Sequence, residues 1–104
     1  MKANSIDNIQ TILKKHKQQL LQFPIQTIFL FGSFAAKQHS EDSDVDLLIR
    51  FHSPIGYFDF FALQHQLQQW LGRDVDLRTE DSLHPLLKED ILREAILLDV
   101  LDAA

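Results

Sequence analysis

The sequence contains no cysteine, so it has neither disulfide bonds nor a thiolate metal site. It lacks any apolar run near the roughly 18 residues that a membrane-spanning helix needs. Its first ten residues, MKANSIDNIQ, lack the apolar core of a signal peptide. From these absences we expect a cytoplasmic protein. No internal repeat, low-complexity tract or linker divides the chain, and we expect a single domain over residues 1–104.

Basic residues are scarce relative to acidic ones. Ten Lys and Arg against 15 Asp and Glu give a formal net charge of -5. A general nucleic-acid-binding protein is usually basic, so this charge argues against one. Hydrophobic residues, by contrast, make up 45% of the chain and include eight Phe, which is enough for one modest core and argues against global disorder.

Apolar spacing and chain-breaking residues divide the sequence into six expected elements. These are a helix over 5–21 with Ser5 as its N-cap, strands over 26–31, 44–51 and 74–78, a helix over 57–71 followed by Gly72, and a helix over 83–97 with Pro85 in its first turn. The order predicts an α/β (α+β) fold, in which a small mixed β-sheet has helices packed against it.

The most informative stretch runs from Ile28 to Ile49, IFLFGSFAAKQHSEDSDVDLLI. Its apolar run ends at Gly32-Ser33, where a strand would give way to a helix whose first N–H groups can bind an anion. After ten intervening residues, Asp44 and Asp46 share one face of the next strand, because strand side chains alternate. Adjacent carboxylates repel each other unless a cation neutralises them, and a hard divalent metal is the usual one.

Gly-Ser, ten residues and Asp-x-Asp together resemble the signature of the nucleotidyltransferase superfamily related to DNA polymerase beta. The short chain is similar to the minimal nucleotidyltransferase (MNT) branch, and the resemblance runs from about Ile25 to Leu98. It implies a nucleotidyltransferase fold and an Mg²⁺-dependent transferase that uses ATP. In such a site Gly32 and Ser33 would bind the nucleotide, while Asp44 and Asp46 would hold Mg²⁺ against its phosphates.

A third carboxylate completes the site in the resembled family, on a neighbouring strand. The strand 74–78 offers two aspartates that face away from the core, Asp74 and Asp76. Asp76 lies in Val-Asp-Leu, which matches the family pattern, so the resemblance favours Asp76 as the third metal-binding and catalytic carboxylate. Asp74 is the alternative.

One part of the signature departs from the family. After Gly-Ser the family commonly continues with x-Ala-Arg-Gly, whereas this chain has Ala36 and Lys37 in place of the last two residues. If the arginine steadies the phosphates or the start of the helix, its loss predicts reduced activity unless Lys37 supplies the charge.

Other polar and aromatic residues have simpler interpretations. Arg50 and Arg78 lie on strands on the carboxylate side, where a salt bridge to a neighbouring aspartate is favoured over a phosphate contact. The histidines show no metal-ligand spacing; they are His16, His39, His52, His65 and His84. The aromatic residues of the predicted helix 57–71 exceed what one helix face can bury, and the excess indicates a partner surface; they are Tyr57, Phe58, Phe60, Phe61 and Trp70.

The MNT resemblance also implies a partner. It implies an antitoxin that transfers AMP from ATP to a tyrosine hydroxyl of a cognate HEPN-type toxin, an RNA-cleaving all-α protein, and so blocks RNA cleavage. The two proteins would form a hetero-oligomer, with no direct nucleic-acid or membrane binding. An alternative is a non-catalytic module that neutralises its partner by stoichiometric binding, but an idle site has no physical reason to keep three carboxylates facing each other. A polymerase-like transferase conflicts with the acidic charge and the small size.

Overall fold

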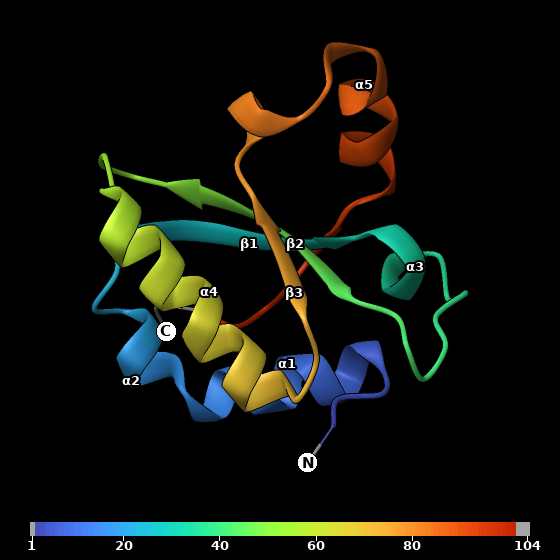
Figure 1. Ribbon diagram of the computed structural model, residues 1–104, viewed down its shortest axis with the longest axis horizontal. Coiled ribbons are helices and arrows are strands. Elements are labelled where there is room, and N and C mark those ends of the chain that lie inside the picture. Colours follow the sequence, from blue (N-terminus) through green and yellow to red (C-terminus); the bar gives the residue numbers. More distant parts are fainter. Residues whose placement is uncertain (1, 102–104) are drawn as a thin grey trace.

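Four strands form one sheet in the computed structural model, which describes residues 2–101 (Figure 1). The strands are β1 (Ile25–Phe31), β2 (Val45–Phe51), β3 (Val75–Arg78) and β4 (Ile96–Leu97). Their order across the sheet is β3-β2-β1-β4, with β1 antiparallel to both β2 and β4, and β2 parallel to β3. The expected mixed sheet is confirmed.

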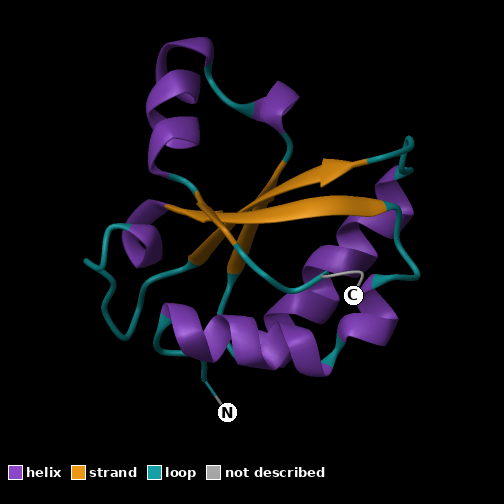
Figure 2. Cartoon of the chain, turned by 180° about the vertical axis from the view of Figure 1, so that it is seen from behind, coloured by secondary structure: helices purple, strands orange, loops and turns teal. Residues whose placement is uncertain are grey.

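Helices lie on both faces of this sheet. They are α1 (Ile6–Lys15), α2 (Lys17–Leu20), α3 (Gly32–Ala35), α4 (Tyr57–Leu71), α5 (Pro85–Glu94) and the 3₁₀ helix η1 (Glu80–Ser82). Both views place α1, α2 and α4 on one side of the strands, with η1 and α5 on the other (Figures 1 and 2). The sheet therefore forms the middle layer, and its two faces have separate apolar clusters.

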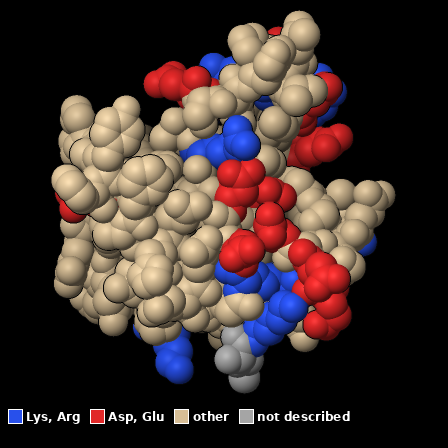
Figure 3. Space-filling model, viewed as in Figure 1, with Lys and Arg blue, Asp and Glu red and all other residues tan. Residues whose placement is uncertain are grey.

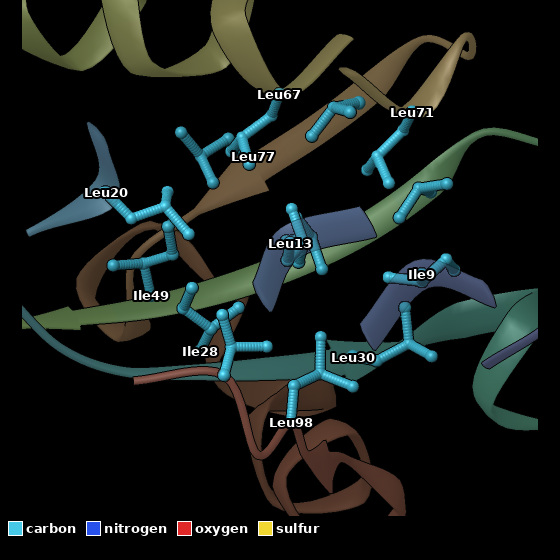
Figure 4. Packing of buried hydrophobic residues seen from close by; sticks show 14 of the residues in the cluster. Ile9, Leu13, Leu20, Ile28, Leu30, Ile49, Leu67, Leu71, Leu77 and Leu98 are labelled. Atoms are coloured by element: carbon cyan, nitrogen blue, oxygen red, sulfur yellow. The ribbon is translucent and has the colours of Figure 1, made fainter. Parts of the chain in front are cut away.

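The main core lies between the sheet and the layer formed by α1, α2 and α4 (Figure 4). Alternation along β2 turns Val45, Leu47 and Ile49 into it, and all three are buried. The helix α4 contributes side chains at every fourth position, the spacing of one helix face, and these are fully buried Leu63, Leu67 and Leu71. Each such leucine stabilises the fold by about 2 kcal/mol.

A smaller cluster covers part of the opposite face. Phe31, Leu48 and Leu83 are its buried members, and residues of α5 pack against it. No residue of α5 is itself buried, and Leu86 and Leu87 on that helix are exposed. Because this layer is thin, polar side chains of β2 and β3 on the same face are left accessible.

Two of the predicted helices have different bounds in the structure. The helix expected over 5–21 has its Ser5 cap, which accepts a hydrogen bond of 3.0 Å from the Asn8 N–H. It breaks at His16, whose N–H donates to the Leu13 carbonyl three residues back and whose ring stacks on Trp70 at 4.2 Å. The packing of this ring on α4 accompanies the division into α1 and α2.

The prediction for the last helix is wrong beyond Glu94. Pro85 does occupy the first turn of α5, but the backbone becomes extended at Ala95. Ile96 and Leu97 then pair with Leu30 and Phe29 of β1 to form β4. A run of apolar residues suits either a helix or an edge strand, and here pairing with β1 decides the outcome.

No helix in the described part of the chain, residues 2–101, has both the length and the apolar character needed to cross a membrane.

The one-turn helix α3 ends in a Schellman motif. The Gln38 N–H donates to the Ser33 carbonyl at 2.8 Å, and the Lys37 N–H donates to the Phe34 carbonyl at 3.1 Å. This geometry places Lys37 in the left-handed region, with φ of +58°. The resembled family commonly has glycine at this position, and the backbone explains why, because glycine adopts a positive φ without steric cost. The departure at Lys37 is therefore a source of local strain.

We predict that Lys37→Gly raises the free energy of unfolding by about 1 kcal/mol, because it removes the left-handed strain of a residue with a side chain. Urea unfolding followed by circular dichroism measures the change. The matched control is Ala36→Gly, at a residue with φ of -82°, where glycine should destabilise the protein. A destabilising effect of Lys37→Gly would contradict the assignment.

Candidate active site

Gly32 and Asp46 are in direct contact where β1 ends and β2 begins. The antiparallel register pairs Phe31 with Asp46, so the residue after β1 lies beside the Asp46 side chain. Gly32 has φ of +73°, and a Cβ there would lie 2.1 Å from Asp46 Oδ2. No side chain can occupy that space. The Asp46 carboxylate occupies the space that a side chain at this position would need, and the role of Gly32 in binding the nucleotide stays a prediction.

The parallel register of β2 and β3 brings a second carboxylate to the same place. Asp46 pairs with Asp76, so both side chains leave the same face of adjacent strands. Burial, followed by the negative charges of Asp76 and Asp44, raises the pKa of Asp46 from 3.8 to about 6, against an opposing effect of Arg78. The sheet thus gathers the three predicted aspartates closely enough for their charges to interact. Acidic side chains form a band across the centre of this face of the molecule (Figure 3).

Asp74, the alternative third carboxylate, lies in a different environment. It precedes β3, its side chain is exposed, and its carbonyl accepts a 2.9 Å hydrogen bond from the Val45 N–H. Its carboxylate is not among the charges that raise the pKa of Asp46, whereas that of Asp76 is. The geometry therefore favours Asp76 as the carboxylate that acts with Asp46.

The two arginines on this face have different partners. Arg78 donates from Nε to both carboxylate oxygens of Asp76, at 3.1 and 3.2 Å, which confirms the expected salt bridge to a neighbouring aspartate. Arg50 instead pairs with Glu80 of η1, and its guanidinium lies 5.3 Å from the centre of the Phe29 ring. Arg78 thus offsets part of the negative charge of the site and orients the Asp76 carboxylate.

The aspartates fit a metal ion only in part. Within residues 2–101, no group of three or more His, Cys, Asp or Glu side chains is arranged to hold an ion by itself. Mg²⁺ is commonly held by one or two carboxylates together with water and substrate phosphate oxygens. The oxygen donors and concentrated negative charge around Asp46 suit that shared mode of binding.

Several histidines have structural contacts instead. His16 stacks on Trp70, and His39 stacks on Phe34 while its Nε2 lies 2.8 Å from the Asn4 carbonyl oxygen. His84 caps α5, where its Nδ1 accepts from the Leu86 N–H at 3.1 Å.

The aromatic excess of α4 lies on the surface as expected. Tyr57 is 84% exposed, Phe58 94% and Phe61 59%. A pocket of about 370 Å³ opens beside Tyr57, and its lining includes Asp76 and Arg78. An apolar surface therefore adjoins the carboxylates on the β3 side.

Comparison with known proteins matches residues 9–98 to the nucleotidyltransferase domain family. The chain belongs to this family. A candidate protein adenylyltransferase of Methanocaldococcus jannaschii is 39% identical over 89 residues, which cover 86% of this nucleotidyltransferase and 96% of the relative. The protein adenylyltransferase MntA of Thermococcus cleftensis is 34% identical over 93 residues, which cover 88% of this chain and 94% of MntA.

Solved structures share the nucleotidyltransferase fold. A candidate minimal nucleotidyltransferase superposes with a TM-score of 0.74 at 32% identity, covering 89% of this chain and 95% of that one. A toxin–antitoxin complex with AMP-PNP gives 0.66 at 24% identity, covering 82% and 71%. The MNT antitoxin fold also occurs in a complex with a tri-AMPylated HEPN toxin of Shewanella oneidensis, with a TM-score of 0.60 at 23% identity, covering 86% and 71%. The resemblance to the MNT branch is confirmed.

We predict that Asp46→Asn stabilises the protein in the presence of a chelator. At about pH 7.5 the substitution should add about 1–2 kcal/mol to the free energy of unfolding, a value discounted for partial screening by solvent. The folded pKa of Asp46, about 6, exceeds the unfolded value of 3.8, so the charged form costs stability above pH 6. This cost fades as the pH falls from 6 towards 4, and the gain from Asp46→Asn should fade with it.

Thermal unfolding across this pH range measures the effect, with Asp81→Asn on η1 as an exposed control that should change little. A gain of equal size at both ends of the range would show that the charge of Asp46 is not its cause.

Proposed function

We propose that this nucleotidyltransferase is an antitoxin that transfers AMP from ATP to a tyrosine hydroxyl of a cognate HEPN-type toxin and thereby neutralises it. The observation that carries the proposal is the meeting of Gly32, Asp46 and Asp76 where three strands adjoin. Relatives named protein adenylyltransferases support the reaction class. The fold shared with MNT antitoxins in complex with HEPN toxins supports the partner.

The position of each site residue suggests a separate role in binding ATP and Mg²⁺. Gly32 leaves the backbone open at the end of β1, and Ser33 would hydrogen-bond a phosphate oxygen of ATP through its hydroxyl and N–H groups. Asp44, Asp46 and Asp76 are the residues that would hold Mg²⁺ together with the phosphates. Mg²⁺ at this place supplies charge neutralisation on the phosphoryl group under attack.

The acceptor would approach from the β3 side. Asp76, oriented by Arg78, would accept the proton of the incoming hydroxyl. The oxygen of that hydroxyl would form the new bond to the α-phosphorus. The bond between the α-phosphorus and its bridging oxygen breaks, pyrophosphate leaves, and AMP remains on the acceptor. Positioning and charge neutralisation carry most of the rate in such transfers.

The surface beside Asp76 suits a protein acceptor. The pocket of about 370 Å³ next to Asp76 and Arg78 is bordered by Tyr57 and Phe60, and Phe58 and Phe61 lie exposed on the same helix. Exposed apolar patches with large aromatic side chains are typical of protein-binding surfaces. In Figure 3 the region on the α4 side of the acidic band is largely free of charge.

A non-catalytic antitoxin is the competing hypothesis. It would neutralise the toxin through the same aromatic surface without any transfer. The register places Asp46 beside Asp76, and burial together with the charges of Asp76 and Asp44 raises the pKa of Asp46. This cost favours the catalytic function, because binding alone does not require it.

The decisive measurement is the intact mass of the toxin encoded beside this protein, after incubation with the protein, ATP and Mg²⁺. We expect a mass gain of one or more AMP units. Asp44→Asn combined with Asp46→Asn should lower the transfer rate by roughly 1,000-fold or more, because several kcal/mol of charge stabilisation are lost.

The matched control is Asp81→Asn combined with Asp90→Asn, which makes the same change in net charge at exposed sites and should leave transfer intact. Without Mg²⁺, transfer should also fail. A stable complex with no mass gain would establish the non-catalytic alternative.

Substitution of the exposed aromatic residues should impair use of the protein acceptor alone. We predict that Tyr57→Ser combined with Phe58→Ser raises the KM for the toxin by about 10-fold, as expected for loss of exposed aromatic contacts. The affinity for ATP, measured by calorimetry, should not change. Leu21→Ser, at a leucine 52% exposed beyond α2, is the control for loss of an apolar surface residue. Equal KM values for the two variants would exclude this surface.

A further inference from the structure

Arg73 is the one charged side chain classed as buried among residues 2–101, with 7% of its surface exposed. Sequence reasoning did not single it out, because an arginine after the glycine that ends a helix carries no motif. In the structure its partners are backbone carbonyl oxygens. Its Nε donates to Ala3, and its Nη1 donates to Ser40 and Glu41 at 3.1 Å and to Ser43 at 2.8 Å.

These carbonyls belong to two segments far apart in sequence. Ala3 lies before α1, while the other three lie in the loop that leads from α3 to β2. This loop ends at Asp44, the residue that precedes β2. A polar loop has few apolar contacts of its own, so hydrogen bonds hold it in place. Arg73 donates those to the Ser40, Glu41 and Ser43 carbonyls, and Lys2 also donates to the Glu41 carbonyl.

The same guanidinium also contacts α3. It lies 4.9 Å from the centre of the Phe34 ring, and that ring is fully buried and stacks on His39 at 4.0 Å. Phe34 is the buried residue of α3, which begins at Gly32. Arg73 therefore touches both ends of the segment that joins Gly32 to Asp46: the short helix at its start and the loop at its end.

We propose that Arg73 is a positioning residue that holds α3 and the loop 40–43 in register, so that Gly32-Ser33, Asp44 and Asp46 face the same space. Its effect on transfer rests on the proposed function, whereas its effect on the loop does not. Lysine cannot replace it, because a single ammonium lacks the planar array of N–H groups that spans these carbonyls.

A chemical rescue experiment tests this role. Arg73 lines an open polar pocket of about 460 Å³, through which a small cation can reach its place. In Arg73→Ala, we expect faster amide hydrogen exchange in residues 38–46 and a fall in the toxin transfer rate of about 100-fold, the scale that a misplacement of about 1 Å can produce. Guanidinium chloride at about 50 mM, far below denaturing molar concentrations, should restore part of the loop protection and part of the transfer rate. Sodium chloride at the same concentration should restore neither.

The matched control is Arg93→Ala, at an exposed arginine paired with Asp90 on α5, which should change neither readout and show no rescue. Arg73→Lys is the second variant, in case Arg73→Ala does not fold; it should keep the fold yet show the same loop exchange and loss of transfer. Normal exchange in residues 38–46 of either folded variant, or loss of transfer in Arg73→Ala without guanidinium rescue, would overturn the proposal.

The two proposals fail in different ways. If the wild-type protein transfers no AMP, the proposed function fails, while loop protection and its recovery with guanidinium still decide the role of Arg73. If the wild type transfers AMP and Arg73→Ala does so equally well, the positioning role is wrong and the proposed function stands.

Discussion

The close approach of the Asp46 carboxylate to the backbone of Gly32 and to Asp76 is the constraint on which the site depends. Burial, and after it the negative charges of Asp76 and Asp44, raises the pKa of Asp46 to about 6. Neighbouring features make this arrangement possible: a glycine where no Cβ fits, a parallel partner strand, and an arginine on Asp76. The fold supplies the stability that such a site lacks, through the leucine-rich core on the other face of the same strands.

Much of the fold could be predicted because its signals are local. The alternation of apolar and polar residues predicted β2, and the helical spacing of apolar residues predicted α4. Gly72 ends α4 as expected, in a left-handed conformation. The break at His16 and the strand β4 could not be predicted from local pattern. His16 stacks on Trp70 and β4 pairs with β1, and both contacts join residues distant in sequence. Local pattern alone leaves such tertiary choices open.

The candidate site shows the same division. Asp44, Asp46 and the Gly32-Ser33 turn stand out by spacing, and the structure places Asp76 rather than Asp74 beside Asp46. The strand pairing that decides between the two aspartates is absent from the sequence pattern. Arg73 has no sequence signal at all, because its partners are backbone carbonyls, which every residue possesses. The catalytic roles of these residues stay predictions.

The parallel pairing of β2 with β3 makes the spacing of the carboxylates inseparable from the packing of the core. A slip of β3 by one residue would move Asp76 towards the leucines and present Val75 or Leu77 on the face that holds Asp46. Burial of these two apolar residues opposes any such slip. Core substitutions in β3 can therefore change the spacing of the carboxylates without altering a polar atom, and evolution of the site is confined to sequences that keep the alternation.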